Sequence, residues 1–389
     1  MNVRPIAIYL PQYHPIPEND KWWGKGFTEW TNVTKGKPLF KNHYQPHLPA
    51  DLGFYDLRVP EVREAQAKLA SEHGIYGFCY YHYWFNGRRI LERPFEEVFK
   101  TARPDFPFML CWANESWTRN WGVYHKNEML IEQSYSEDDD RNHIKYLLHF
   151  FDDERYIRVN GKPVIAIYDS LSLPDAKKTL EIWREEAFKI GMELYICRFE
   201  RSYINTAEEY IEYGFDAAID FQPFGSIMGS YKNYHAERMK NSFLKKSRHI
   251  FYKKIASKIY KTAYQKYWDQ GRRWLDYKDY ANFAINTNFP DYKWFPGITP
   301  MWDNTARRGE KSFLLKNADP ETYQKWLESI LKKFKPYSED ENFFFINAWN
   351  EWAEGNHLEP CLKWGMQYLE ATSYALEMIK NKIPAERHA

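Results

Sequence analysis

The chain has 389 residues, a formal net charge of +1 and 28% charged residues. This length allows one large barrel or two average domains, and the nearly balanced charge gives no global field that favours nucleic acid. No stretch reaches the roughly 18–20 apolar residues of a membrane span. The first residues hold one arginine and a short apolar run before Pro11, so we expect no signal peptide and a soluble, cytoplasmic protein.

Eight short apolar runs, rich in β-branched and aromatic residues, are typical of buried parallel strands. They cover residues 6–10, 75–84, 106–112, 163–169, 193–199, 215–221, 296–304 and 342–350. Amphipathic helical patterns lie between them. This alternation predicts a single (β/α)8 TIM barrel over residues 1–389, with long βα loops. An open doubly wound sheet is the alternative, but "PQYHPIPEND" follows the first run where that fold favours a glycine-rich turn.

Two connections are long. Residues 11–59 form a loop rich in Pro, Trp and His, and residues 225–295 form an insertion after the sixth strand. Residues 226–273 carry 13 Lys or Arg against two acidic residues, interleaved with aromatic and aliphatic residues. We expect a basic, helical subregion, either solvated or docked on an anionic membrane surface or a lipid-linked glycan. No nucleic-acid-binding motif accompanies the charge, so we expect no nucleic-acid partner.

Aromatic residues make up 19% of the chain, including 16 Trp and 30 Tyr. They indicate either a large aromatic core or a carbohydrate site in which flat rings stack on sugars, and composition leaves both open. The cysteines, Cys79, Cys111, Cys197 and Cys361, are far apart and show no metal-type spacing. We therefore predict buried free thiols and neither a metal nor a cofactor.

In a (β/α)8 barrel the chemistry lies at the carboxyl ends of the strands and in the loops that follow. The residues there are carboxylates, amides, imidazoles and aromatic rings. As substrate-binding residues we predict Tyr13, His14, Glu29, Trp30, Tyr81, His82, Trp84, Trp112, Asn114, Glu115, Trp117, Tyr168, Trp302, Asp303, Asn350 and His357. Each has a structural alternative: a single histidine is more often structural, Glu115 is as well suited to a salt bridge, and Asp303 to a loop cap.

The last predicted strand runs into "NAWNEWAEGNHLEP", residues 347–360. Glu351 and Glu354 stand three residues apart, interleaved with Trp349 and Trp352 and followed by Gly355. Paired carboxylates among aromatic rings suit glycosidic bond cleavage, in which one group protonates the leaving oxygen and the other acts as nucleophile or base. Apolar surroundings raise a carboxyl pKa and keep that group protonated near neutral pH. The alternative is a solvated helix turn or a helix cap.

Several long motifs in order resemble one family. They are "AIYLPQYHPIPENDKWWGKGFTEWTNV", "QPHLPADLGFYDLR", "GFCYYHYWF", "CWANESWTR" and "WNEWAEGNHLEP". This set is similar to the WbsX-type proteins, glycosyltransferases of surface-polysaccharide clusters that are related to glycoside hydrolase family 99, the endo-α-mannosidases. The resemblance runs from residue 5 to about residue 370.

The resemblance implies a (β/α)8 barrel that acts on α-linked, mannose-like sugars with retention. In the hydrolases two glutamates of an N-E-W-x-E-G motif carry catalysis, and they match Glu351 and Glu354. By that analogy Glu351 is the base that deprotonates the sugar's own 2-hydroxyl, and Glu354 is the acid/base on the glycosidic oxygen. The chain has Ala353 where the hydrolases carry histidine, which leaves the linkage and the substrate open.

Three functions remain as hypotheses. The first is a glycoside-hydrolase-like enzyme of bacterial O-antigen or capsule metabolism that acts on α-mannoside-like linkages with retention. The second is a glycosyltransferase that assembles surface polysaccharide on the same barrel. Its nucleotide-sugar form would favour a DxD motif, and "EDDDR" at 137–141 contains one, but at a predicted helix start where acids are common. The third is a non-catalytic glycan-binding protein.

Overall fold

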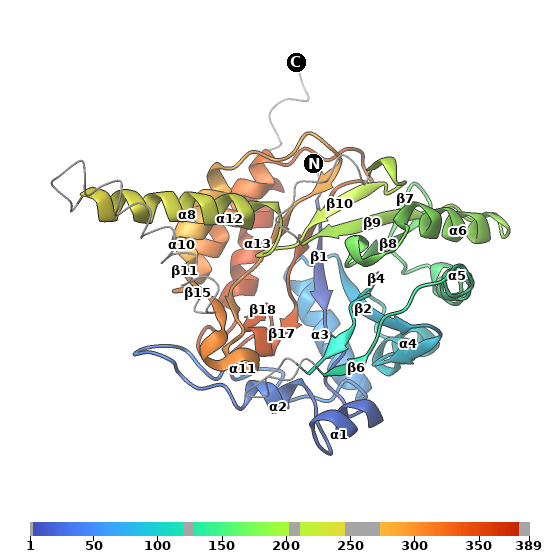
Figure 1. The fold of residues 1–389 in the computed structure, drawn as a ribbon, viewed down its shortest axis with the longest axis horizontal. Helices are drawn as coiled ribbons and strands as arrows, with labels where there is room; N and C mark the ends of the chain where they lie inside the picture. The colour runs from blue at the N-terminus through green and yellow to red at the C-terminus, as the bar shows by residue number, and fades with distance from the viewer. Residues whose placement is uncertain (1–2, 120–127, 202–210, 246–272, 381–389) are drawn as a thin grey trace.

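The computed structural model describes residues 3–119, 128–201, 211–245 and 273–380, and its centre is a parallel barrel (Figure 1). The barrel strands are β1 (Arg4–Tyr9), β2 (Gly77–Phe85), β4 (Phe108–Trp112), β8 (Lys162–Ile167), β9 (Tyr195–Glu200), β10 (Ala217–Asp220), β12 (Trp294–Phe295), β13 (Gly297–Ile298) and β16 (Phe343–Ile346). They pair in the order β12-β10-β9-β8-β4-β2-β1-β16-β13. Only Pro296 separates β12 from β13, so the sheet closes on itself. The predicted (β/α)8 barrel is confirmed.

Helices cover the outside of the barrel, which explains why the strands are apolar on both faces. The covering helices are α3 (Pro60–Glu72), α4 (Arg93–Thr101), α5 (Glu137–Phe151), α6 (Ala176–Phe188), α10 (Tyr277–Asn286), α12 (Pro320–Lys333) and α13 (Gln367–Lys380). Their starts follow helix-capping rules: Pro60 opens α3, and the side chains of Ser136 and Asp319 accept backbone N–H bonds at the starts of α5 and α12.

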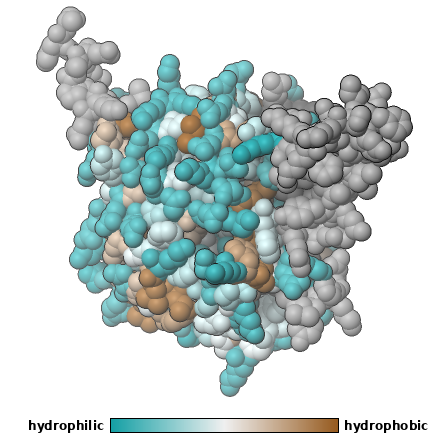
Figure 2. All heavy atoms as spheres, turned by 90° about the vertical axis from the view of Figure 1, so that its left-hand side faces the viewer, coloured by the Kyte–Doolittle hydropathy of each residue, from teal (hydrophilic) through white to brown (hydrophobic). Residues whose placement is uncertain are grey.

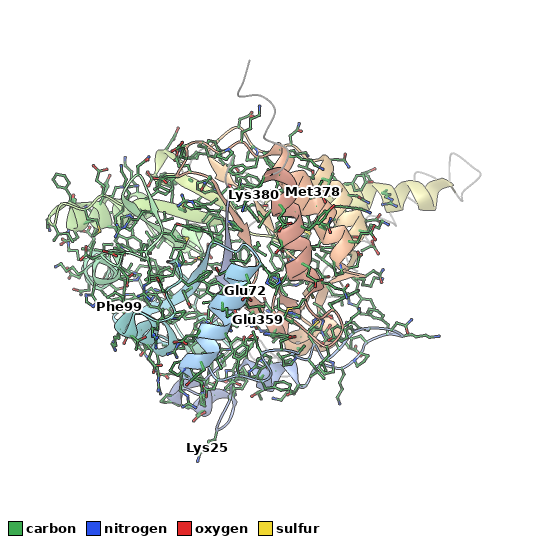
Figure 3. The ribbon with its side chains drawn as sticks, turned by 180° about the vertical axis from the view of Figure 1, so that it is seen from behind. Lys25, Glu72, Phe99, Glu359, Met378 and Lys380 are labelled. Atoms are coloured by element: carbon green, nitrogen blue, oxygen red, sulfur yellow. The ribbon has the colours of Figure 1, made fainter. Side chains whose placement is uncertain are left out.

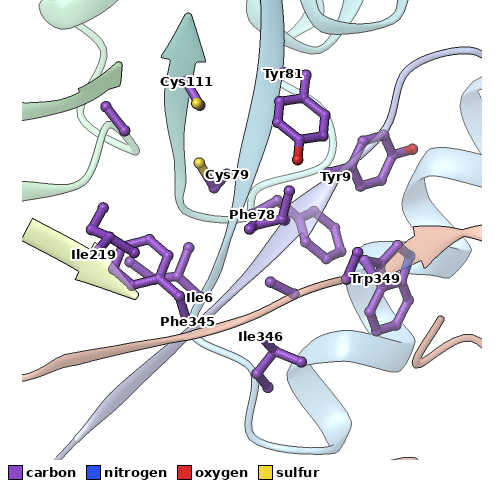
Figure 4. Packing of buried hydrophobic residues seen from close by; sticks show 14 of the residues in the cluster. Ile6, Tyr9, Phe78, Cys79, Tyr81, Cys111, Ile219, Phe345, Ile346 and Trp349 are labelled. Atoms are coloured by element: carbon purple, nitrogen blue, oxygen red, sulfur yellow. The ribbon is translucent and has the colours of Figure 1, made fainter. Parts of the chain in front are cut away.

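The barrel interior is a packed core (Figure 4). Ile6, Ile219 and Phe345 pack together from three strands, and the sulfurs of Cys79 and Cys111 face each other from β2 and β4. All four cysteines are free and buried, as predicted.

The seventh strand lies earlier than the sequence predicted. The expected range was 296–304, whereas the strand is the β12–β13 pair, residues 294–298. Trp302 and Asp303 instead form β14, which pairs antiparallel with β15 (Phe313–Lys316). β15 in turn pairs with β11 (Arg273–Asp276), so these strands make a second, small sheet outside the barrel. The apolar run contained two strands of different sheets, which hydropathy cannot separate.

The insertion after the sixth strand is also corrected. It begins in α8 (Ser226–Lys245), which projects from the body, but it then supplies β11 and α10, and residues 294–295 belong to the barrel. Most of its basic residues lie in 246–272, outside the described residues, so the membrane or lipid-linked partner stays a prediction. On the side at the left of Figure 1, the coloured surface is mostly hydrophilic (Figure 2). Among the described residues, no helix combines the length and the apolar character that crossing a membrane requires.

Loops and short elements gather at the carboxyl ends of the strands, the lower side of Figure 1. The helical ones are α1 (Pro17–Trp23), α2 (Glu29–Val33), α11 (Thr305–Arg308), η1 (Ser170–Ser172), η2 (Gly309–Lys311) and η3 (Trp352–Glu354). The short strands β5 (Trp117–Thr118), β6 (Met129–Ile131), β17 (Asn350–Glu351) and β18 (Asn356–His357) form two small antiparallel ribbons. β3 (Arg88–Ile90) and β7 (Arg158–Val159) extend β2 and β8 as antiparallel partners.

Candidate active site

A cavity of about 330 Å³ opens at the carboxyl ends of the barrel strands. Its lining comes from the ends of β1, β2, β4 and β8, the β5–β6 ribbon, α11 and the segment after β16. The lining residues are Leu10, Gln12, Trp23, Tyr81, Tyr83, Ala113, Glu115, Ser116, Trp117, Thr118, Leu130, Tyr168, Arg307, Arg308, Glu351 and Glu354. Carboxylates, guanidinium groups and aromatic rings therefore share one concave site, where this fold places its chemistry.

Glu351 and Glu354 both line this cavity because of the local backbone. Glu351 ends the two-residue strand β17, and a single turn of 3₁₀ helix, η3, carries Glu354. Gly355 closes the turn in the left-handed conformation, with φ of +54°. A side chain would be strained there, so the glycine lets the chain reverse at once into β18.

The guanidinium group of Arg307 holds three carboxylates. Its Nη2 lies 3.0 Å from Glu351 Oε2, and its Nη1 lies 2.5 Å from Glu354 Oε1. Its Nε donates to Glu29 Oε1 at 3.0 Å, and Nη2 also donates to Glu29. Gln12 Nε2 donates to the other Glu29 oxygen at 3.0 Å. Because Glu29 is completely buried, it acts here through Arg307 rather than by facing the cavity.

Burial and crowding of negative charge raise the carboxyl pKa values of this cluster. Burial, followed by the charge of Glu354, raises the pKa of Glu351 to about 8. Burial also raises the pKa of Glu354, and Glu29 contributes in the same direction to both. Arg307 opposes the shift at both glutamates and Arg308 opposes it at Glu354, but burial outweighs them. The pKa values of both carboxyls therefore shift upward, in the direction that favours a protonated carboxyl near neutral pH.

Asn350 and Tyr13, both predicted to bind substrate, hold in place the segment that carries Glu351 and Glu354. The Asn350 side chain pairs with the backbone of Leu10 in both directions, at 2.7 and 3.0 Å. The hydroxyl of Tyr13, which is completely buried, donates to the Asn350 carbonyl. Both residues join the segment that carries Glu351 and Glu354 to the end of β1, and both lie outside the cavity lining.

Glu359 is a third buried carboxylate at the end of this segment. It accepts hydrogen bonds from Tyr55 Oη at 2.7 Å, Gln66 Nε2 at 2.6 Å and Trp352 Nε1 at 2.6 Å, and burial raises its pKa to about 7. Figure 3 places it beside α3, which supplies Gln66. Three hydrogen bonds to buried partners give Glu359 a structural role. The bond from Trp352 fixes the indole ring that stands in the sequence between the two cavity glutamates.

Aromatic rings form the walls of the cavity. Tyr81 and Tyr168 meet edge to face, with ring centroids 5.8 Å apart, and Tyr83 meets Trp117 in the same way at 5.3 Å. Tyr81, Trp117 and Tyr168 were predicted as substrate-binding residues, and all three line the cavity. Tyr83 was not, although it stands two residues after Tyr81 on β2 and so shares its face.

The same alternation directs His82 and Trp84 away from the cavity, toward α5. His82 Nε2 lies 2.9 Å from His143 Nε2, and Trp84 Nε1 donates to Asp139 at 2.9 Å. Trp112 likewise points outward, with its ring 5.8 Å from that of Trp183. We therefore remove His82, Trp84 and Trp112 from the candidate site, because their faces of β2 and β4 pack on the helices.

At the rim, Glu115 lines the cavity and pairs with Arg201 at 2.5 Å, so the salt bridge and the cavity position occur together. Asn114 is buried and bridges to the backbone of Asp169 on the neighbouring strand end, at 2.8 Å in both directions. It positions the rim instead of lining the cavity.

The remaining predicted residues lie outside the cavity lining. Trp30 packs on Trp352 and donates to Tyr55, whereas His14 is buried in the first long loop. His357 stacks on Trp352 with ring centroids 3.8 Å apart. Trp302 and Asp303 line a second cavity on the other side of η3.

Sequence reasoning missed Arg307, the residue that joins the two glutamates. It lies in "NTARRGEK", where two arginines on a short helix resemble an ordinary solvated turn. No local pattern separates Arg307 from Arg308, so only the packing of α11 against η3 identifies it.

The sequence pattern of the family described as Glycosyltransferase WbsX matches residues 5–372. The chain belongs to the WbsX glycosyltransferase family. It is 38% identical over 377 residues to the WxcX proteins of two strains of Xanthomonas campestris pv. campestris. That match covers 95% of this chain and 49% of each relative, so this WbsX chain spans about half the length of the curated relatives it matches.

Solved structures share the fold of this WbsX protein at 13% sequence identity. The endo-α-mannosidase of glycoside hydrolase family 99 from Bacteroides thetaiotaomicron, in complex with bis-tris-propane, has a TM-score of 0.56 and covers 97% of this chain and 98% of its own. A glycoside hydrolase-like protein has a TM-score of 0.57, covering 96% of this chain and 94% of its own. The likeness to these structures shows the barrel fold that the WbsX chain shares with them.

Proposed function

We propose that this WbsX chain acts on α-mannoside-like linkages with retention, in bacterial surface-polysaccharide metabolism, through Glu351 and Glu354. The observation that carries the proposal is that both carboxylates line one aromatic-walled cavity and share one guanidinium group, Arg307. The family resemblance of the N-E-W-x-E-G segment supports the assignment of roles.

In the proposed reaction Glu351 accepts the proton of the sugar's 2-hydroxyl, and the freed oxygen bonds to C1. The bond from C1 to the glycosidic oxygen breaks at the same time, and Glu354 gives its proton to that leaving oxygen. In the second half, Glu354 takes a proton from water as the water oxygen bonds to C1, the C1–O2 bond breaks, and Glu351 returns its proton to O2. Two displacements at C1 retain its configuration.

The charge of the site suits this chemistry. With one proton on the glutamate pair, Glu29 and the other glutamate leave two negative charges, and Arg307 and Arg308 contribute two positive charges. The ionised glutamate of the pair is the group that stabilises the positive charge developing at C1. In the free site burial favours the proton on Glu351, whose side chain is 7% accessible against 21% for Glu354. The scheme requires the shared proton to lie on Glu354 when sugar is bound, so sugar binding must move it within the pair.

Transfer to a sugar hydroxyl in place of water is the second candidate, since the same pair serves both acceptors. A metal-bound nucleotide sugar at "EDDDR" is not supported by the packing there. Asp140, the second acid of the DxD string, accepts from Thr179 of α6 at 2.8 Å, and its neighbour Asp139 accepts from Trp84 of β2, so these two carboxylates join α5 to the elements beside it.

The test is release of new reducing ends from α-mannans and from the source organism's own polysaccharide. We expect release by the wild type and a loss of about 10²–10⁴-fold in Glu354→Gln and in Glu351→Gln, the usual contribution of a general acid or base. Glu72→Gln, on the exposed surface of α3, is the matched control and should retain full activity.

No release from any glycan would exclude the hydrolase, and lipid-linked acceptors with nucleotide-sugar donors would then test transfer. If the protein only binds glycans, the wild type and Glu351→Gln should bind the ligand equally well, and neither should release or transfer a sugar. Cytoplasmic location and membrane association stay predictions.

A further inference from the structure

A second cavity, of about 90 Å³, lies on the opposite side of η3 from the candidate active site. It shares no lining residue with the first cavity, but the two meet at one peptide bond, because Glu354 lines the first and Gly355 lines the second. Its other walls come from residues 40–47, β14, β15 with the following turn, and residues 363–364. None of the functions considered above uses this cavity.

Hydrogen bonds determine which ring nitrogen of His47, on the wall of this cavity, carries a hydrogen. His357 Nδ1 lies 2.9 Å from the carbonyl oxygen of Glu359, an acceptor only, so His357 Nδ1 carries the hydrogen. His357 is buried without an acidic partner in the described chain and is neutral, so its Nε2 accepts. His47 Nδ1, at 3.1 Å from that nitrogen, must therefore donate. The remaining nitrogen of His47, Nε2, is left with a lone pair.

His47 is 5% exposed and lines the second cavity. Within the described ranges no donor reaches its Nε2, so this nitrogen offers a fixed acceptor to a hydroxyl group of a ligand. The hydrogen bond from His47 Nδ1 to His357, and that from His357 to the carbonyl of Glu359, hold the His47 ring in this orientation on the cavity wall.

Positive charge and aromatic rings surround this acceptor. Lys363 Nζ lies 5.1 Å from the ring centroid of Tyr44 and 4.5 Å from that of Trp364, and Lys316 Nζ lies 5.9 Å from that of Phe40. In the part of the chain that the structure describes, neither ammonium group has an acidic partner. The one acid of the lining, Asp303, is occupied by His43 at 2.6 Å and Gln45 at 2.8 Å. The cavity is therefore electropositive.

We propose that this cavity binds an acidic sugar unit, a hexose ring that carries a carboxylate or a phosphate group. A ring hydroxyl donates to His47 Nε2, the anionic group faces Lys363, and the aromatic rings contact the apolar face of the sugar. About 90 Å³ is well below the roughly 300–1,000 Å³ of pockets for drug-sized ligands, so the cavity suits one ring rather than a nucleoside diphosphate. The proposal concerns binding alone and does not depend on catalysis by Glu351 and Glu354.

Ligand-observed NMR titration of the full chain tests the proposal, with glucuronic acid and mannose 6-phosphate as acidic probes and mannose as the neutral one. We expect both acidic probes to bind more tightly than mannose. Lys363→Gln should weaken the acidic probes about tenfold, the loss of one charged hydrogen bond, and leave mannose unchanged. His47→Phe should weaken all three. If only one acidic probe responds to Lys363→Gln, that response identifies the anionic group the cavity prefers.

Two matched variants locate the binding. Lys177→Gln, an exposed lysine on α6, and Glu354→Gln, in the first cavity, should both leave the acidic probes unchanged. Lys363 is itself exposed, so Lys363→Gln is expected to fold normally and the result does not depend on His47→Phe alone. Equal affinity for mannose and the acidic probes, insensitivity to Lys363→Gln, or loss of binding only in Glu354→Gln would each overturn the proposal.

Discussion

Arg307 Nη1 lies 2.5 Å from Glu354 Oε1, although the two residues stand 47 positions apart and follow different strands of the barrel. The same guanidinium group reaches Glu351 and the buried Glu29. A buried cation that contacts three carboxylates sets the charge of the site, and it couples the proton on the glutamate pair to a residue that never faces the cavity.

Glu29→Gln should shift the pH dependence of activity to lower pH. Glu29 raises the pKa of Glu351 and of Glu354 by charge repulsion, so its removal lowers both and the pair loses its proton at lower pH. The alkaline limb of a kcat/KM profile therefore moves down, with a smaller loss of maximal rate than in Glu354→Gln. Glu72→Gln is the control. An unchanged or upward-shifted limb would contradict the coupling through Arg307.

Gly355→Ala should lower both stability and activity. Its φ is +54°, and a Cβ there would lie 2.9 Å from the carbonyl oxygen of Asp303, so the η3 turn that carries Glu354 must move. Gly365→Ala is a close control, because φ is +52° and nothing lies within 4 Å. Both variants should lose about 1–2 kcal/mol of stability, because alanine is strained in the left-handed conformation. Gly355→Ala should lose a further ~1–3 kcal/mol from overpacking and about 10²-fold in kcat. Equal unfolding free energies would show that the turn tolerates the methyl group.

Trp117→Ala and Trp84→Phe test the two faces of the barrel wall. Trp117 lines the cavity, and its loss should raise KM about tenfold, or about 1.4 kcal/mol of binding. It also packs on Tyr83, so the variant should lose about 0.5–1.5 kcal/mol of stability for that ring pair. Trp84 donates to Asp139 at 2.9 Å, and Trp84→Phe should cost about 1–3 kcal/mol of stability while KM stays the same. Steady-state kinetics and urea unfolding measure both. A raised KM in Trp84→Phe would return that residue to the site.

Asp220→Asn should change how stability depends on pH. Burial raises the pKa of Asp220 from its ordinary value of 3.8 to about 8, so between these two pH values the folded protein holds one proton more than the unfolded chain. Stability contributed by this group is therefore lost as pH rises, at about 1.4 kcal/mol per pH unit. Asparagine lacks this pH-dependent loss. The free energy of unfolding of Asp220→Asn should therefore rise relative to that of the wild type between pH 5 and pH 8. The exposed Asp105→Asn is the control, and parallel curves for Asp220→Asn and wild type would contradict the shift.

The sequence predicted much of the candidate site because strand ends and motifs are local. Glu351, Glu354, Glu115, Trp117, Tyr81 and Tyr168 all line the cavity. His82 and Trp84 were predicted with Tyr81, since all three are aromatic residues near one strand end. The register of β2 sends alternate side chains inward and outward, and hydropathy cannot reveal which face is which when both faces are buried.

The sequence by itself determined the barrel, because eight apolar runs alternating with amphipathic helices leave few other ways to bury so much apolar surface. It also determined the glutamate pair, whose spacing and tryptophan neighbours are local. Only the tertiary structure decided that Arg307 binds this pair and that His47 presents an acceptor to a second cavity. Both depend on contacts between distant segments, and the low dielectric of a buried site makes those contacts strong enough to control where protons and charges lie.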